Sequence, residues 1–96
     1  MITEQTPLEA SATMADAGIP QHMHGAVYRY FVNRIEGGSF LMALLENDLK
    51  ETIARADAIN KQSLPAYIEY FYWNVPSGSW GSRMKVDKWL HDEVPA

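Results

Sequence analysis

The stretch that decides the fold class is SFLMALLENDLKETIARA, residues 39–56. Ser39 is a residue type favoured at a helix N-cap. Glu51 and Arg55 stand four residues apart in the order that supports a helix through an ion pair. The apolar and small side chains recur every three or four residues, which places them on one helix face: Leu41, Leu44, Leu45, Leu49, Thr52, Ile53 and Ala56. The stretch therefore predicts an amphipathic helix over residues 40–56.

Toward the N-terminus, a second helix is predicted over residues 20–36. Pro20 suits the first turn of a helix, and Gly37-Gly38 can take the left-handed conformation of a C-terminal cap. Apolar side chains recur at four-residue steps between these limits: Met23, Val27, Phe31 and Ile35. Residues 1–18 are rich in Thr, Ala, Ser, Glu and Asp and hold no sustained apolar period. They predict a flexible arm with a transient turn over residues 8–17.

Toward the C-terminus, Ser63 can cap a third helix, with Pro65 tolerated in its first turn. The expected apolar face comprises Leu64, Tyr67, Ile68, Phe71, Tyr72 and Val75. A β-strand is the alternative because residues 67–73 are rich in aromatic side chains, but the neighbouring segments are helical and no partner strand is visible. Residues 57–63 predict a turn or a short helical start, and residues 76–82 predict a loop.

Ser82 can cap a short last helix over residues 83–92, with Val86, Trp89 and Leu90 facing inward. Together these elements predict an all-α fold, a small bundle of three main helices plus a short C-terminal helix. The bundle is expected to form one domain over residues 19–96, preceded by the flexible arm.

The length and composition of the chain limit the ways in which the fold can be stabilised. A domain of 96 residues buries a modest share of its surface, so oligomerisation is a common source of additional stability. The absence of Cys excludes disulfides, thiolate metal sites and cysteine nucleophiles. These observations lead us to expect a homo-oligomer.

The charge and hydropathy patterns exclude two kinds of partner. A formal net charge of −4 argues against direct binding to duplex DNA, which is a polyanion. No run approaches the roughly 18 apolar residues that a membrane helix needs, so no membrane partner is expected. Residues 1–5 lack the basic region and apolar stretch of a signal peptide. We therefore expect the protein to act in the cytoplasm of the cell that makes it.

Residues 67–73 form an aromatic belt that holds more rings than one helical stripe can bury. One interpretation is a central helix buried on several sides. The other is a protein interface, where Tyr and Trp are favoured. The interface prediction rests on four side chains: Tyr67, Tyr70, Phe71 and Trp73.

Two Gly/Ser turns, residues 37–39 and 77–82, precede predicted helices and could hold a phosphate on free helix N–H groups. Trp80 supplies a flat stacking surface, and arginines lie nearby. The predicted ligand-binding residues are Ser39, Ser79, Trp80, Ser82, Arg83, Arg29 and Arg34. The alternative is that Gly and Ser are ordinary turn and cap residues here. Neither turn has the spacing of a P-loop or of a dinucleotide fingerprint.

The sequence predicts no catalytic residue, no metal site and no cofactor, and thus no enzyme. His22 and His24 stand two residues apart and do not share a helix face. Ser79 lies in Gly-Ser-Trp-Gly, which lacks the strand–turn–helix elbow of hydrolases. His91 and Asp92 are adjacent, so their side chains diverge on a helix.

Four segments together resemble a family of small uncharacterised proteins of tailed bacteriophages and prophages: residues 37–41, 47–50, 56–60 and 78–82. The resemblance spans about residues 19–90. It implies expression inside a bacterium, where small accessory phage proteins often block host defences.

Three functional hypotheses follow. The first is a non-enzymatic binding protein that counters a host defence by sequestering a nucleotide-like phosphorylated ligand. The second is an inhibitor similar in role to anti-CRISPR proteins, which binds a host defence protein through the aromatic belt or an acidic helix face. The third is a phage structural or regulatory protein.

Overall fold

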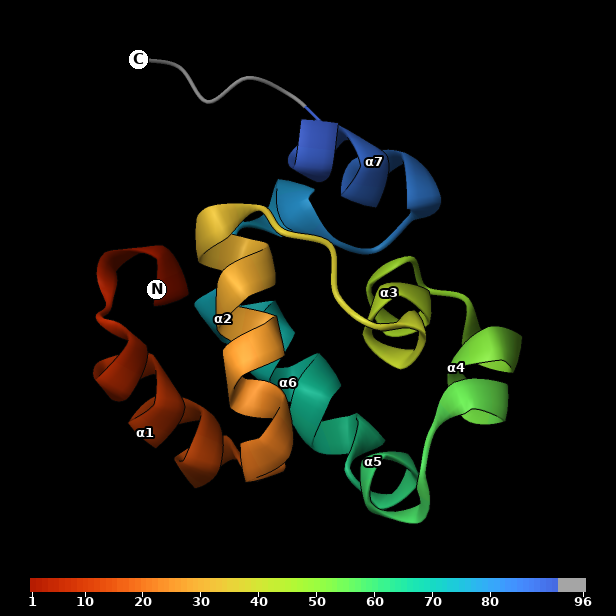
Figure 1. Ribbon diagram of the computed structural model, residues 1–96, viewed down its shortest axis with the longest axis horizontal. Coiled ribbons are helices and arrows are strands. Elements are labelled where there is room, and N and C mark those ends of the chain that lie inside the picture. Colours follow the sequence, from red (N-terminus) through yellow and green to blue (C-terminus); the bar gives the residue numbers. More distant parts are fainter. Residues whose placement is uncertain (92–96) are drawn as a thin grey trace.

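The computed structural model describes residues 1–91, and in them every regular element is helical (Figure 1). None of these helices exceeds eleven residues. The α-helices are α1 (Pro7–Ala17), α2 (His24–Asn33), α3 (Ser39–Leu45), α4 (Leu49–Arg55), α5 (Ala58–Gln62), α6 (Leu64–Asn74) and α7 (Arg83–His91). Short 3-10 turns occupy Ile2–Glu4, Gln21–Met23 and Ser77–Ser79. The predicted all-α class is confirmed, while the helices are shorter and more numerous than the predicted three plus one.

The core forms where α2 and α6 meet, with α1 on one side and α3 to α5 on the other (Figure 1). The Phe31 and Phe71 rings meet edge to face, with their centroids 5.3 Å apart. Phe40 of α3 packs on Tyr67 of α6 in the same way at 5.7 Å. Such edge-to-face pairs stabilise a core beyond their buried area. A cluster of aromatic rings therefore holds the two central helices together.

The prediction of a flexible arm over residues 1–18 is wrong, because this segment forms the helix α1. The Thr6 hydroxyl accepts from the Glu9 amide, and the Glu9 carboxylate accepts from the Thr6 amide, which together make a capping box. Gly18 ends the helix in the left-handed conformation, at φ +93°. Three apolar side chains of the segment are buried: Ile2, Ala10 and Met14. They are too few to make a visible apolar period, yet they suffice to dock α1 on the core.

The helix predicted over residues 40–56 is broken into α3 and α4. Asn47 takes φ +61°, and the Asp48 amide donates to the Ala43 carbonyl, closing a Schellman motif. The Asp48 carboxylate then accepts from the Glu51 amide and begins α4. Asn tolerates the left-handed conformation better than most residues, and Asp is a strong N-cap. The adjacent pair therefore stops one helix and starts the next.

The helix predicted over residues 20–36 is also shorter than expected, since α2 ends at Asn33 and not at Gly37-Gly38. Arg34 takes φ +57°, and its guanidinium lies 3.7 Å from the centre of the Trp89 ring. The same guanidinium donates to the Trp89 carbonyl at 3.2 Å, and the Trp89 indole donates to the Tyr30 carbonyl at 3.1 Å. This Arg34–Trp89 clasp fastens α7 to α2.

The predictions for the C-terminal half agree more closely with the structure. The segment with the strand alternative is the helix α6, so the helical interpretation is confirmed. Ser82 caps α7 as predicted, because its hydroxyl accepts from the Lys85 amide at 3.1 Å. On α7, the Val86 side chain is buried, and those of Trp89 and Leu90 are half-buried. The predicted last residue of this helix, Asp92, lies outside the described residues.

Candidate functional site

The aromatic belt of α6 divides between the core and the surface. Tyr67, Tyr70 and Phe71 are almost fully buried, so their prediction as interface residues is wrong for the folded chain. Trp73 is 72% exposed and Tyr72 is 70% exposed. Helical periodicity explains the division, because positions 67, 70 and 71 share one face while positions 72 and 73 lie on another. Of the predicted interface residues, only Trp73 is available to a partner.

Trp73 belongs to a continuous surface that we call the aromatic face, formed by Leu64, Pro65, Ile68, Tyr72 and Trp73. These residues and Glu69 line a shallow hollow of about 670 Å³. The Tyr72 and Trp73 rings meet edge to face, with centroids 4.8 Å apart. Sequence periodicity assigned Ile68 and Tyr72 to the core and thus missed this surface. The aromatic face presents apolar groups with one carboxylate and suits an apolar partner.

The Gly/Ser turn at residues 77–82 serves the fold. Ser79 is fully buried, its hydroxyl donates to the Pro76 carbonyl, and its own carbonyl accepts from the Tyr30 hydroxyl at 2.6 Å. The Gly81 amide donates to the Leu45 carbonyl at 2.7 Å. These bonds use the polar groups that were predicted to meet a phosphate. The prediction of Ser79 as a ligand-binding residue is therefore wrong.

Trp80 retains part of the predicted ligand site. Its half-buried ring packs on Phe71 with a centroid distance of 5.3 Å. We call the hollow of about 480 Å³ beside it the Trp80 pocket, lined by Phe71, Tyr72, Ser77, Trp80, Gly81 and Lys85. Aromatic surface and one cation meet here, but the cation is Lys85 instead of an arginine. Ser82 does not line this pocket.

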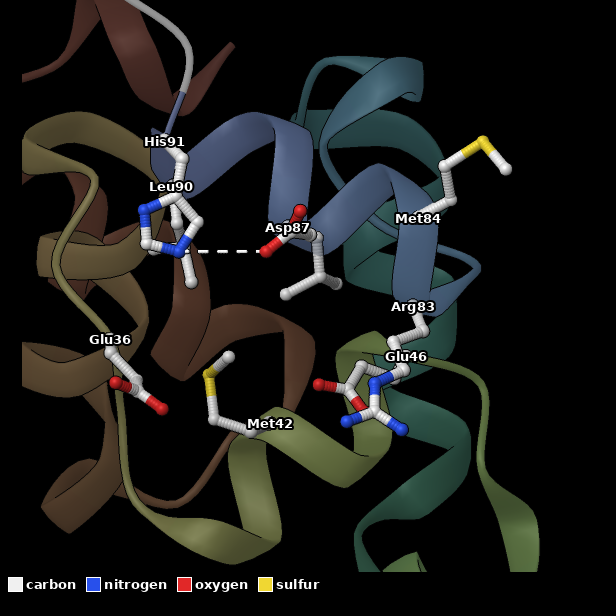
Figure 2. A pocket seen from close by; sticks show the side chains of 9 residues that line it. Glu36, Met42, Glu46, Arg83, Met84, Asp87, Leu90 and His91 are labelled. Atoms are coloured by element: carbon white, nitrogen blue, oxygen red, sulfur yellow. Dashed lines mark ion pairs between the residues drawn. The ribbon is translucent and has the colours of Figure 1, made fainter.

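Arg83 lies in a different hollow, the α7 pocket, of about 550 Å³ (Figure 2). Carboxylates of Glu36, Glu46 and Asp87 line the same pocket, and the His91 ring lies 3.5 Å from Asp87. Its apolar lining comes from Met42, Met84, Val86 and Leu90. Three carboxylates facing one arginine disfavour a phosphate. This environment does not support the prediction of Arg83 as an anion-binding residue.

The remaining predicted ligand residues do not converge on either pocket. Ser39 is an exposed residue in the first turn of α3, where Gly38 occupies the N-cap position. Arg29 is exposed on α2, and Arg34 is engaged with Trp89 in the clasp. Neither the Trp80 pocket nor the α7 pocket is lined by any of the three. The two Gly/Ser turns therefore do not form the single site that the sequence predicted.

Comparison with known proteins adds no functional information about these features. No protein-family model matches the chain, and neither a curated protein nor a solved structure matches it. Within residues 1–91, no group of three or more His, Asp or Glu side chains could hold a metal ion. In that same part of the chain, no helix has the length and apolar character needed to cross a membrane. The fold and its surfaces define a small all-helical domain with an exposed aromatic face.

Proposed function

We propose that this chain is a protein-binding domain that docks on its partner through the aromatic face of α6. The observation that carries the proposal is the exposure of Trp73 and Tyr72 side by side, next to Ile68 and Leu64. Trp80 and Trp89, by contrast, are half-buried against the core. Exposed Trp and Tyr side chains are typical of binding hot spots, because covering them removes a large apolar area from water.

The chemistry of the aromatic face describes the partner surface that fits it. Its centre is apolar, and Glu69 places one carboxylate at the lining. A complementary surface offers apolar side chains and one cation. The resemblance to phage proteins supports a host defence protein as this partner, and binding would then block that defence. A second copy of the chain is the other partner with a matching apolar surface, which corresponds to the expected homo-oligomer.

Trp73→Ala is expected to weaken partner binding by about 30-fold or more, the effect of removing a hot spot worth about 2 kcal/mol. Met84→Ala is the matched control, since Met84 is also a large exposed apolar residue, 79% exposed, but lies on α7. Sedimentation equilibrium at micromolar concentration measures self-association, and affinity capture from a bacterial host extract measures other partners.

The proposal fails if the wild-type chain is monomeric and both variants capture the same host proteins as the wild type. It holds if Trp73→Ala alone loses the partner while its thermal unfolding stays close to that of the wild type. The comparison with Met84→Ala separates a specific surface from a general effect of exposed apolar groups.

A second candidate function, sequestration of a small phosphorylated ligand, is favoured by the meeting of Trp80, Tyr72 and Lys85 in the Trp80 pocket. A ligand at 100-fold its dissociation constant is expected to stabilise the wild type by about 2.7 kcal/mol. Lys85→Gln should remove most of this gain, and Arg83→Gln should retain it. Thermal unfolding with a panel of nucleoside phosphates makes the measurement. Equal stabilisation of both variants would exclude the Trp80 pocket as the binding site.

A further inference from the structure

A serine and a histidine meet where α1 packs beside the start of α2. The Ser11 hydroxyl oxygen lies 2.7 Å from Nδ1 of His24. The other ring nitrogen of His24, Nε2, lies 2.8 Å from the Ile19 carbonyl oxygen. His24 is buried, at 6% exposure, whereas Ser11 is half-buried. The two residues are thirteen positions apart and are brought together by the turn at Gly18.

The hydrogen bonds identify the tautomer of the neutral His24 ring. A carbonyl oxygen only accepts, so Nε2 of His24 donates its hydrogen to Ile19. Nδ1 of the neutral ring then carries a lone pair, and the Ser11 hydroxyl donates to it. This is a hydroxyl bound to a base that is oriented by a third group. The same arrangement activates serine nucleophiles in general.

The pair opens into a hollow, here called the Ser11 pocket, with a volume of about 570 Å³. Small and apolar residues line most of it: Leu8, Ala12, Ala15, Gly18 and Ile19. Gln21 also lines the pocket, and its residue type carries a side-chain amide, a group that can donate to a developing oxyanion. The pocket therefore combines a hydroxyl, a base, an amide donor and apolar walls.

We propose that Ser11 is an activated nucleophile that accepts a short acyl group from an activated ester. The Ser11 oxygen attacks the acyl carbonyl carbon, and its proton passes to Nδ1 of His24. The bond between the acyl carbon and the leaving oxygen breaks, and the leaving oxygen takes the proton from His24. The products are an acyl-Ser11 ester and a free alcohol or phenol, with no change of oxidation state. This reaction is independent of the aromatic face, which lies on α6.

Thr13 provides an internal comparison on the same helix. Its hydroxyl donates to the Glu9 carbonyl at 3.1 Å and accepts from the Gln5 amide. A carbonyl oxygen cannot take up the proton during attack, so Thr13 lacks the base that Ser11 has. A general base accelerates such a step by about 100-fold or more. The two hydroxyls should therefore differ in reactivity by at least that factor.

The test treats the wild-type chain with p-nitrophenyl acetate and follows acetylation at each residue by peptide mass spectrometry. We expect Ser11 to be acetylated about 100-fold faster than Thr13, and Ser11→Ala to lose that acetylation. His24→Ala should abolish the fast reaction, and added imidazole should restore part of it. Restoration by a free base is an effect that a purely structural role of His24 does not produce.

The proposal is overturned if Ser11 reacts no faster than Thr13 in the wild-type chain. That ratio is measured without any substitution, so it stays decisive even where a His24 variant fails to fold. It is also overturned if a folded His24→Ala variant is acetylated at Ser11 at the wild-type rate. Met84→Ala changes an exposed residue of α7 that does not line the Ser11 pocket, so it should leave the Ser11 reaction unchanged.

Discussion

Replacing Phe71 with alanine is expected to lower the free energy of unfolding by about 3–5 kcal/mol. The Phe71 side chain is fully buried, and its ring packs against both Phe31 and Trp80 with centroid distances of 5.3 Å. Truncation removes those contacts and leaves a cavity between α2, α6 and the 77–82 turn. The loss is a large share of the roughly 5–15 kcal/mol that stabilises a typical domain. We therefore expect the Phe71→Ala chain to unfold at a clearly lower urea concentration than the wild type.

The adjacent residue supplies the matched control. Tyr72 is 70% exposed on the aromatic face, so Tyr72→Ala should change the free energy of unfolding by no more than about 0.5 kcal/mol. Urea unfolding followed by circular dichroism measures both variants. Equal losses at positions 71 and 72 would contradict the division of α6 into a buried and an exposed face.

A second large effect is expected at alkaline pH. Burial raises the pKa of Tyr70 to about 12 from an ordinary value of 10.0. Burial is also the main cause that raises the pKa of Tyr30 and Tyr67, with a further contribution from the negative charges of Glu46 and Asp57 respectively. The unfolded chain releases these protons near pH 10 while the folded chain retains them. Stability is therefore fully present below pH 10 and falls as the pH rises through about 12.

The free energy of unfolding is expected to fall by about 1.4 kcal/mol per pH unit for each such tyrosine, or by about 4 kcal/mol per pH unit for all three. The tyrosinate absorbance of the three buried tyrosines should rise together with the loss of helical circular dichroism, in one transition. Tyr70→Phe should move that transition to higher pH, whereas Tyr72→Phe should not. The Tyr70 hydroxyl has no hydrogen-bond partner among the described residues, so its removal should cost little stability at neutral pH. Ionisation of these three buried tyrosines near pH 10 without unfolding would refute the prediction.

Local sequence patterns predict the all-α class because the apolar spacing is clearest in the segments that form the core. The apolar spacing in residues 39–56 and 64–75 identifies segments that pack on the core. The break at Asn47-Asp48 escaped prediction because the apolar period continues across it, while a left-handed Asn and an Asp cap decide the local backbone. The capping box at Thr6 and Glu9 was a visible signal for α1. The prediction of a flexible arm did not use this signal, because it rested on the lack of a sustained apolar period in residues 1–18.

The surfaces were harder to predict, since they depend on how helices pack. Five aromatic positions in seven do not reveal which rings a neighbouring helix covers, and contacts with Phe31 and Phe40 bury only some of them. The Trp80 pocket draws residues from α6, the 77–82 turn and α7. The Ser11–His24 pair depends on the docking of a segment that was expected to be flexible. Residue spacing within one sequence does not predict such contacts between distant segments.

The brevity of the helices has a consequence for how the chain folds. Isolated helices shorter than about 12–15 residues are marginal in water, and those of the described residues run from five to eleven residues. Each helix thus exists because its neighbours hold it. Contacts such as the Arg34–Trp89 clasp join residues 55 positions apart. Forming them costs the entropy of closing a long loop before the contacts add stability. We therefore expect backbone order and side-chain packing to arise in one cooperative transition.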